Sequence, residues 1–212
     1  MKKLVFSLCM SLFISISLVC LVNNTETALE NGIIRLHVRA NSDSPSDQAL
    51  KLKVRDRIIR ECSDFLKNTD IKDARKEIIK NSEKIVSVAS DEIQKNGYTY
   101  PVNIKFGKSD FPTRVYSDIT LPAGTYEALT VEIGNASGQN WWCVLFPPLC
   151  FVDETCTAIS QESEDILIDN LGEDTYEMIK SGDKGSIKIR FKIYELWENG
   201  KIKLQTLMTK LR

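Results

Sequence analysis

The chain has 212 residues, with 28 Lys or Arg against 29 Asp or Glu, and its net charge of −1 excludes the broad basic surface that binding to nucleic-acid phosphates requires. Its length suits one domain with a real hydrophobic core. The sequence contains neither internal repeats nor low-complexity tracts, which excludes a repeat architecture.

The N-terminus has the pattern of an export signal. Lysines at positions 2 and 3 precede an almost wholly apolar run over residues 4–22, as in a secretory signal peptide or an uncleaved membrane anchor. The run is only just long enough to span a bilayer, so its length does not choose between the two. Val19 is too large for a lipoprotein cleavage site before Cys20, which disfavours lipidation. The sequence therefore predicts a signal peptide or N-terminal anchor at residues 1–22 and an exported domain at residues 23–212.

Export also determines how the cysteines are interpreted. Cys9 and Cys20 lie in the signal region, and the other four cysteines are Cys62, Cys143, Cys150 and Cys156. In an oxidising compartment these four can form disulfides. A zinc site is not indicated, because no CxxC pair occurs and His37 is the single histidine. Without residues 1–22 the chain has 26 basic and 29 acidic residues, a net charge of −3.

The first predicted elements are a strand over residues 33–39 and a helix that begins after Ser44. The strand alternates apolar residues on one face with basic residues, including His37, on the other. Ser44 is a natural N-cap, and Pro45 and Asp47 fit the first helical turn and the capping box. An apolar stripe at helical spacing follows, formed by Leu50, Val54, Ile58, Cys62 and Phe65.

A second long helix is predicted over residues 70–96, because apolar residues again recur at helical spacing until Gly97 ends the pattern. After Gly97 the apolar residues recur with a period of two, which is typical of strands. Strands are predicted over residues 100–106, 115–121, 126–133 and 187–194.

An acidic segment separates the last two of these strands. Residues 153–184 hold ten Asp or Glu against two Lys, and their weak apolar content predicts a surface excursion with a short helix at residues 175–180. Residues 197–211 fit either a hairpin at Asn199-Gly200 or a short terminal helix. The pattern as a whole predicts an α+β fold: one strand, two long helices and then a mostly antiparallel sheet, in a single domain.

Signals of catalysis are weak, and the sequence predicts no enzyme activity, no cofactor and no metal site. In the Gly-Asn-Ala-Ser-Gly stretch at residues 134–138, the serine stands one position too late for a nucleophile elbow. A hydrolase would need His37 as its base, but the neighbouring Arg35 and Arg39 disfavour the imidazolium. A cell-envelope hydrolase using His37 is the alternative, and a hydrogen-bonded strand histidine fits the pattern better.

Polar residues gather where the first strand leads into the first helix. A strand end and a helix N-terminus meet there, presenting backbone donors together with side chains of both charges. We expect this surface to bind a partner through His37, Arg39, Asn41, Asp43, Asp47, Lys51 and Arg55. The alternative for most of these residues is a solvated helix face with i,i+4 charge pairs.

Two blocks of the chain resemble the stage II sporulation protein R family. The first block reads Ile-Arg-Leu-His-Val-Arg-Ala-Asn-Ser-Asp over residues 34–43 and Asp-Gln-Ala-Leu-Lys-Leu-Lys-Val-Arg-Asp over residues 47–56. The second block contains Tyr126-x-Ala-Leu, Ile133-Gly134 and, over residues 140–150, Asn-Trp-Trp-Cys-Val-Leu-Phe-Pro-Pro-Leu-Cys. The acidic segment, Cys62 and Cys156 match no part of the family's pattern.

The resemblance implies a secreted, non-enzymatic signalling protein of endospore-forming bacteria. Such a protein is made in the forespore and exported into the space between the forespore and mother-cell membranes. There it activates a membrane-embedded aspartic protease, which processes the precursor of the mother-cell sigma factor E. The alternative is an anchored structural or interaction module with no signalling role, and cleavage of the signal would distinguish the two.

The two adjacent tryptophans are a further candidate for partner binding. Neighbouring residues on a strand point to opposite faces. We therefore expect one of Trp141 and Trp142 to complete the core and the other to face a partner. The alternative is that both are buried.

Cys143 and Cys150 bracket a Pro147-Pro148 pair, which excludes a helix and favours a tight return of the chain. A disulfide between the two cysteines would close a short ring and stiffen it. The alternatives are two free thiols, or a bond from Cys150 to Cys156.

Overall fold

The structure, a computed structural model, describes residues 6, 10–13, 27–67, 69–150 and 159–180. A short helical stretch at residues 27–32 leads into the first strand. The elements that follow are β1 (Ile34–Arg39), α2 (Pro45–Leu66), α3 (Ile71–Lys80), α4 (Ser82–Lys95), β2 (Val102–Phe111), β3 (Arg114–Tyr116), β4 (Ile119–Leu121), β5 (Gly124–Ile133), β6 (Asn140–Phe146), α5 (Gln161–Leu171) and α6 (Glu173–Lys180).

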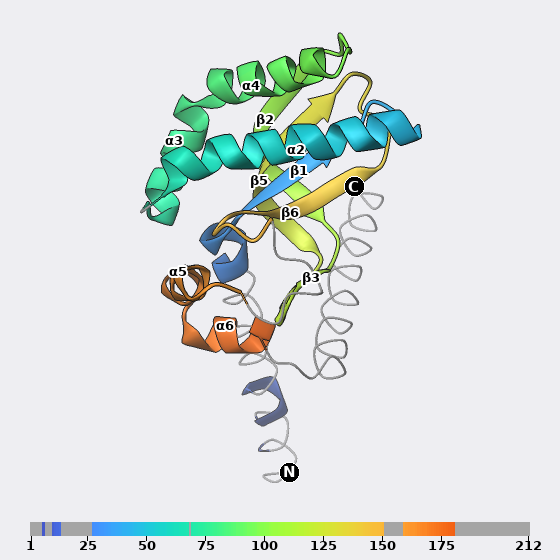
Figure 1. The fold of residues 1–212 in the computed structure, drawn as a ribbon. Helices are drawn as coiled ribbons and strands as arrows, with labels where there is room; N and C mark the ends of the chain where they lie inside the picture. Colours follow the sequence, from blue (N-terminus) through green and yellow to red (C-terminus); the bar gives the residue numbers. More distant parts are fainter. Residues whose placement is uncertain (1–5, 7–9, 14–26, 68, 151–158, 181–212) are drawn as a thin grey trace, which may run out of the picture.

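A four-stranded sheet forms the centre of the molecule, with the strand order β2-β5-β1-β6. β1 runs parallel to β5, and the β2–β5 and β1–β6 pairs are antiparallel. A separate two-stranded sheet, β3–β4, lies beyond one end of the larger sheet (Figure 1). The prediction of an α+β fold with a mostly antiparallel sheet is confirmed.

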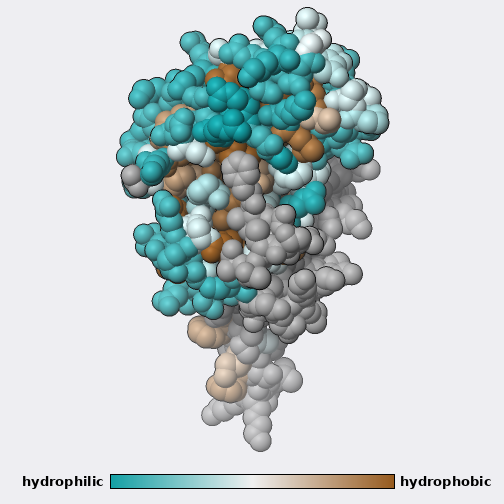
Figure 2. Space-filling view, in the orientation of Figure 1, coloured by the Kyte–Doolittle hydropathy of each residue, from teal (hydrophilic) through white to brown (hydrophobic). Residues whose placement is uncertain are grey.

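The helices α2 and α4 cover one face of the sheet (Figure 1). The predicted N-cap is present, because the Asp47 amide donates to Ser44 Oγ at 3.1 Å. The predicted apolar stripe of α2 is buried from Leu50 to Cys62, whereas Phe65 is only partly buried. Side chains on the outer face of this helix layer are mostly hydrophilic (Figure 2). The layer is therefore amphipathic, with its apolar face toward the sheet and its polar face outward.

The prediction of one helix over residues 70–96 is wrong, because the chain breaks at Asn81 into α3 and α4. The Asn81 amide and side-chain Nδ2 both donate to the Glu77 carbonyl, at 2.9 and 2.8 Å. Asn81 itself has a φ of −92° and a ψ of 12°, outside the helical region. The apolar spacing continues across the break, since Ile78 and Ile85 are both fully buried. The spacing therefore does not reveal the break.

The prediction of a single strand over residues 115–121 is also wrong. β3 and β4 are three-residue strands joined by a tight turn, in which Ser117 has a φ of 54°. Arg35 is fully buried rather than solvated, and its Nη2 donates to Tyr116 Oη of this hairpin at 3.1 Å. Arg35 Nε donates to the Cys143 carbonyl at 3.0 Å, and its guanidinium lies 4.4 Å from the Phe111 ring centroid.

The acidic segment is not a surface excursion in its described part. Residues 161–171 form α5, which was not predicted, and α6 extends the predicted short helix. Leu167 and Ile179 are fully buried, so the few apolar residues of the segment pack into the core while its carboxylates face outward. The predicted strand at 187–194, residues 197–211 and most of residues 1–22 lie outside the described residues.

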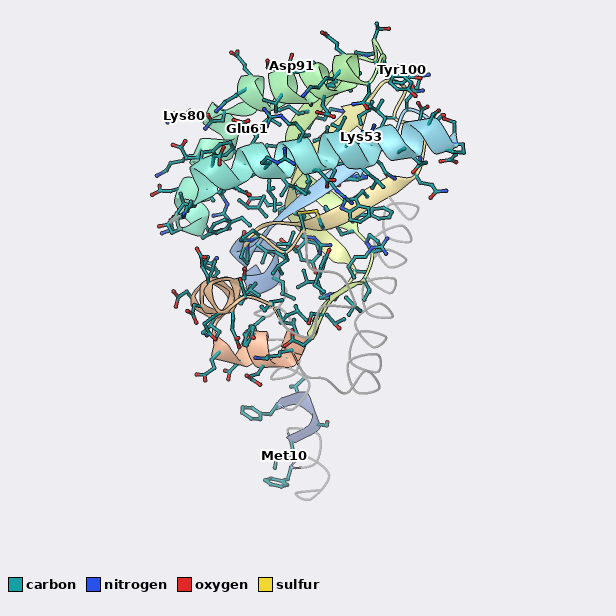
Figure 3. The ribbon with its side chains drawn as sticks, viewed as in Figure 1. Met10, Lys53, Glu61, Lys80, Asp91 and Tyr100 are labelled. Carbon is teal, nitrogen blue, oxygen red and sulfur yellow. A yellow bond between two sulfur atoms is a disulfide. The ribbon has the colours of Figure 1, made fainter. Side chains whose placement is uncertain are left out.

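Two helices that are distant in sequence are joined by a charge pair. Glu61 of α2 is only 6% exposed, and it accepts from Lys84 of α4 at 2.5 Å and pairs with Arg57 at 3.1 Å. Figure 3 shows Glu61 on the side of α2 that faces α4. Among the described helices, none is both long and apolar enough to cross a membrane.

Candidate partner-binding site

Two loops that are far apart in sequence are bonded together at one end of the sheet. The loop at residues 40–44 connects β1 to α2, and the loop at residues 134–139 connects β5 to β6. The Asn41 carbonyl accepts from the Ser137 hydroxyl at 2.6 Å, and Asn41 Oδ1 accepts from the Asn135 amide at 2.9 Å. Asn41 therefore bonds the second loop through both its backbone and its side chain.

Two aspartates complete this contact. Asp43 Oδ1 accepts from the backbone N–H of Gln139 at 2.7 Å. Asp47 Oδ2 accepts from Asn41 Nδ2 at 2.8 Å and from Ser42 Oγ at 2.6 Å. Asp47 is only 4% exposed. The hydrogen bond from Ser42 is the largest cause that lowers the pKa of this carboxyl group below its usual value.

Glycines allow the two loops to approach so closely. A Cβ atom at Gly138 would overlap the Ser42 carbonyl oxygen, and one at Gly134 would overlap the Asn41 side chain. Gly134 also has a φ of +58°, which favours glycine. The spacing of these glycines in the sequence carries no sign that they contact a second loop.

Lys51 joins the same network from α2. Its ammonium donates to Gln48 Oε1 at 2.6 Å and to the Gln139 carbonyl at 3.0 Å. The residue is only 5% exposed, and burial is the main cause that lowers the pKa of its amine. We call Asn41, Asp43, Asp47 and Lys51 the loop clamp, because all four fix the loops at residues 40–44 and 134–139.

A groove of about 650 Å³ lies next to the loop clamp, along β6. α2 forms one wall, the β3 strand forms the other, and β6 lies between them. The described residues that line it are Gln48, Lys51, Leu52, Arg55, Arg114, Val115, Tyr116, Gln139, Asn140, Trp141, Trp142, Cys143 and Cys150. We call this the β6 groove.

The two tryptophans point to opposite faces of β6, as predicted. Trp141 lies opposite Val38 in the register, and Trp142 lies opposite His37. Both are half-buried, so neither is a simple core residue nor a fully exposed one. The guanidinium of Arg55 lies 4.1 Å from the Trp141 ring centroid, and that of Arg114 lies 5.0 Å from the Trp142 ring centroid.

His37 contacts two residues that line this groove, Trp142 and Asn140. Its ring stacks on Trp142 with the centroids 5.6 Å apart, and its Nε2 is 2.7 Å from Asn140 Oδ1. Burial is the largest cause that lowers the pKa of this imidazole. Arg39 lies further along β1, where it pairs with Glu132 at 3.4 Å, and it is not among the described residues that line the groove.

The predicted disulfide is present between Cys143 and Cys150, with the Cα atoms 5.0 Å apart. Both cysteines line the β6 groove, and the bond ties the middle of β6 to the loop that follows the strand. Cys62 is buried in the core as a free thiol, and burial raises its pKa to about 12. Such a thiol is chemically inert.

The described residues contain no cluster of three or more His, Cys, Asp or Glu side chains suited to hold a metal ion. The basic and aromatic groove is instead suited to non-covalent binding, because cations and indoles provide charge and apolar area together. Arg114 is a cation of the groove that the sequence did not single out, since it stands alone between two predicted strands. Only the fold brings it opposite Arg55.

The fold is an α+β domain with a basic, aromatic groove at the edge of its sheet. The sequence model of the family described as stage II sporulation protein R matches residues 30–156, and the chain belongs to this family. That range contains the loop clamp and every described residue that lines the groove. The helices α5 and α6 lie beyond it.

A relative supports the same assignment. The chain is 40% identical, over 143 residues, to the stage II sporulation protein R of Bacillus subtilis (strain 168). The matched region covers 67% of this chain and 64% of that protein, which is less than two thirds of the relative's length. No solved structure matches the chain.

Proposed function

We propose that this chain is an exported signalling protein of sporulation. In this proposal it acts in the space between the forespore and mother-cell membranes. There it binds the outer part of a membrane-embedded aspartic protease and activates processing of the sigma factor E precursor. Membership of the stage II sporulation protein R family supports the role in sporulation, and the basic, apolar N-terminal segment supports export.

The observation that carries the binding role is the composition of the β6 groove. It gathers six residues that the sequence pattern singled out, namely Lys51, Arg55, Trp141, Trp142, Cys143 and Cys150. Tryptophan and arginine are the side chains that most often dominate binding energy at protein interfaces. The loop clamp and the disulfide hold these side chains on ordered backbone, which lowers the entropy lost on binding.

A non-enzymatic role fits the surroundings of His37. This histidine contacts the Asn140 amide and the rings of Trp142 and Phe111. A catalytic base needs instead a nucleophile on one side and an orienting acid on the other. We therefore favour an activator that works by binding over a hydrolase that uses His37.

Reconstitution tests this function. The full chain is co-expressed in a host that does not sporulate, together with the protease and the sigma factor E precursor. Immunoblotting of the precursor then measures its processing. We expect processing when all three proteins are present and none when either this chain or the protease is omitted. Unprocessed precursor in the presence of all three would contradict the proposal.

A further inference from the structure

The strand β6 has an outer edge. It pairs with β1 on one side, and no other described strand pairs with it on the opposite side. An edge strand presents backbone N–H and C=O groups that can pair with an added strand. The β6 groove lies along this strand, since Asn140, Trp141, Trp142 and Cys143 of β6 line it.

The charged side chains that line the groove in the described residues are all cationic. Its described lining includes the cations Lys51, Arg55 and Arg114, and no carboxylate. Arg55 is partly neutralised by Asp56 at 2.6 Å, whereas Arg114 forms no ion pair with a described residue. A chain whose net charge is −1 therefore concentrates positive charge in this groove, which favours an acidic occupant.

The groove also offers apolar contact on both sides of the strand. The indoles of Trp141 and Trp142 flank β6 on opposite faces, and Leu52 of α2 is 37% exposed beside them. An added strand sends alternate side chains to opposite faces. It would therefore meet one indole and one arginine on each face of the sheet.

The chain's own segments are poor occupants. Residues 181–212 carry eight Lys or Arg against three Asp or Glu, which a basic groove repels. The acidic residues 161–180 are helical in α5 and α6, so a second copy of this chain offers them as helices and not as a strand. Charge complementarity therefore favours an extended acidic segment of a partner protein as the occupant of the β6 groove.

We propose that the β6 groove binds an extended acidic segment of the partner protein, which pairs with the outer edge of β6 as an added strand. Its carboxylates lie against Arg55 and Arg114, and its apolar atoms lie on the two indoles. Recognition by strand addition draws affinity from main-chain hydrogen bonds and specificity from alternate side chains. The identity of the partner as a membrane protease rests on the proposed function, but the chemistry of the groove does not.

A ten-residue peptide of alternating threonine and glutamate is the probe, with alternating threonine and lysine as its matched control. Fluorescence anisotropy of the labelled peptides measures their affinity for the full chain, and hydrogen exchange measures the protection of β6 amides. We expect saturable binding of the acidic peptide only, together with slower exchange of β6 amides. Equal binding of both peptides, or no binding at millimolar concentration, would overturn the proposal.

Charge reversal separates this groove from the rest of the surface. Arg55→Glu and Arg114→Glu are each expected to weaken the acidic peptide at least about tenfold, since each turns an attraction into a repulsion. Arg60→Glu is the matched control, because Arg60 is exposed on the same helix and does not line the groove. An equal loss of affinity in the control would show that only the overall charge matters, and the groove would be excluded.

The same variants distinguish this inference from the proposed function. Loss of peptide binding with unchanged processing of the sigma factor E precursor leaves the groove established and contradicts its use in protease activation. Sedimentation of the full chain shows whether a second copy occupies the groove. A dimer that Arg114→Glu dissociates would overturn the assignment to a partner protein.

Discussion

Asp47 accepts hydrogen bonds from two side chains, Asn41 and Ser42, while its own amide donates to Ser44. The Ser44 hydroxyl thus caps α2 by accepting from the Asp47 amide, while the Asp47 carboxylate holds the loop that precedes the helix. Its position also explains how a charged residue is tolerated at 4% exposure, since each buried polar atom that faces it is bonded.

We expect Asp47→Ala to destabilise the domain by about 2–3 kcal/mol, because it leaves Asn41 Nδ2 and Ser42 Oγ without their acceptor. Urea unfolding followed by circular dichroism measures the change. Asp64→Ala is the control, since Asp64 is exposed on the same helix. A loss below about 0.5 kcal/mol, as is usual for a surface substitution, would show that the loops hold without the clamp.

At the residue scale, the sequence identified the polar residues near the end of β1 but not what each of them contacts. Asn41, Asp43, Asp47 and Lys51 stood out as polar residues near a strand end, and the structure brings them together. Asn41, Asp43 and Lys51 bond the loop at residues 134–139, about ninety positions away, whereas Asp47 bonds Asn41 and Ser42 of the nearer loop. No local pattern encodes such a contact, so a spacing argument could not separate a binding surface from an internal clamp.

At the scale of elements, the N-terminal end of α2 and its buried apolar face could be predicted from the sequence. The break between α3 and α4 and the burial of Arg35 could not. The Ser44-Pro45 start of α2 follows from local hydrogen bonding and a fixed φ. The break at Asn81 is accompanied by hydrogen bonds from its own amide and side chain to the Glu77 carbonyl, and Arg35 is buried against Tyr116 of the β3–β4 hairpin. A periodic apolar pattern contains neither of these contacts.

The contact between α2 and α4 depends on pH through Glu61. The hydrogen bond from Lys84 is the largest cause that lowers the pKa of this carboxyl group below the 4.5 of an ordinary glutamate. A group with a lowered folded-state pKa stabilises the fold above its unfolded pKa and loses this effect as pH falls through the folded value. Glu61 therefore stabilises the helix pair at neutral pH and not in strong acid.

We expect Glu61→Gln to cost about 1–2 kcal/mol at pH 7, because two cations lose the negative charge that they share. The difference from the unmodified protein should shrink as pH falls through the lowered folded-state pKa of Glu61, because the glutamate is then protonated. Urea unfolding at a series of pH values measures this. Asp91→Asn on the outer side of α4 is the control (Figure 3), and a pH-independent difference would contradict the assignment.

At the scale of the whole molecule, opposite charges occupy different parts. The β6 groove is cationic, whereas residues 153–184 hold ten acidic side chains against two lysines. Seven of these carboxylates lie on α5 and α6, which pack at the end of the molecule away from α2 and α4 (Figure 1). Separation of this kind limits neutralisation of the groove by the chain's own acids, because screening in salt shortens the reach of each charge.

The N-terminal segment and the domain have separable tasks. The described core begins at Leu29 and draws on residues through Ile179, so no described core side chain comes from residues 1–22. Deletion of residues 2–22 should therefore leave the domain folded, with an unchanged unfolding midpoint in urea. The same deletion should abolish signalling, since a chain that stays on its own side of a membrane does not reach a receptor on the other side.

Processing of the sigma factor E precursor in sporulating cells measures this signalling. Replacing residues 2–22 with an unrelated cleavable signal peptide is the matched control and should restore processing to the original level. Restoration would also show that a permanent membrane anchor is not needed, because the new signal is removed after export. Normal processing by the deleted form would contradict the requirement for export, and failure of the replacement would mean that residues 2–22 act beyond targeting.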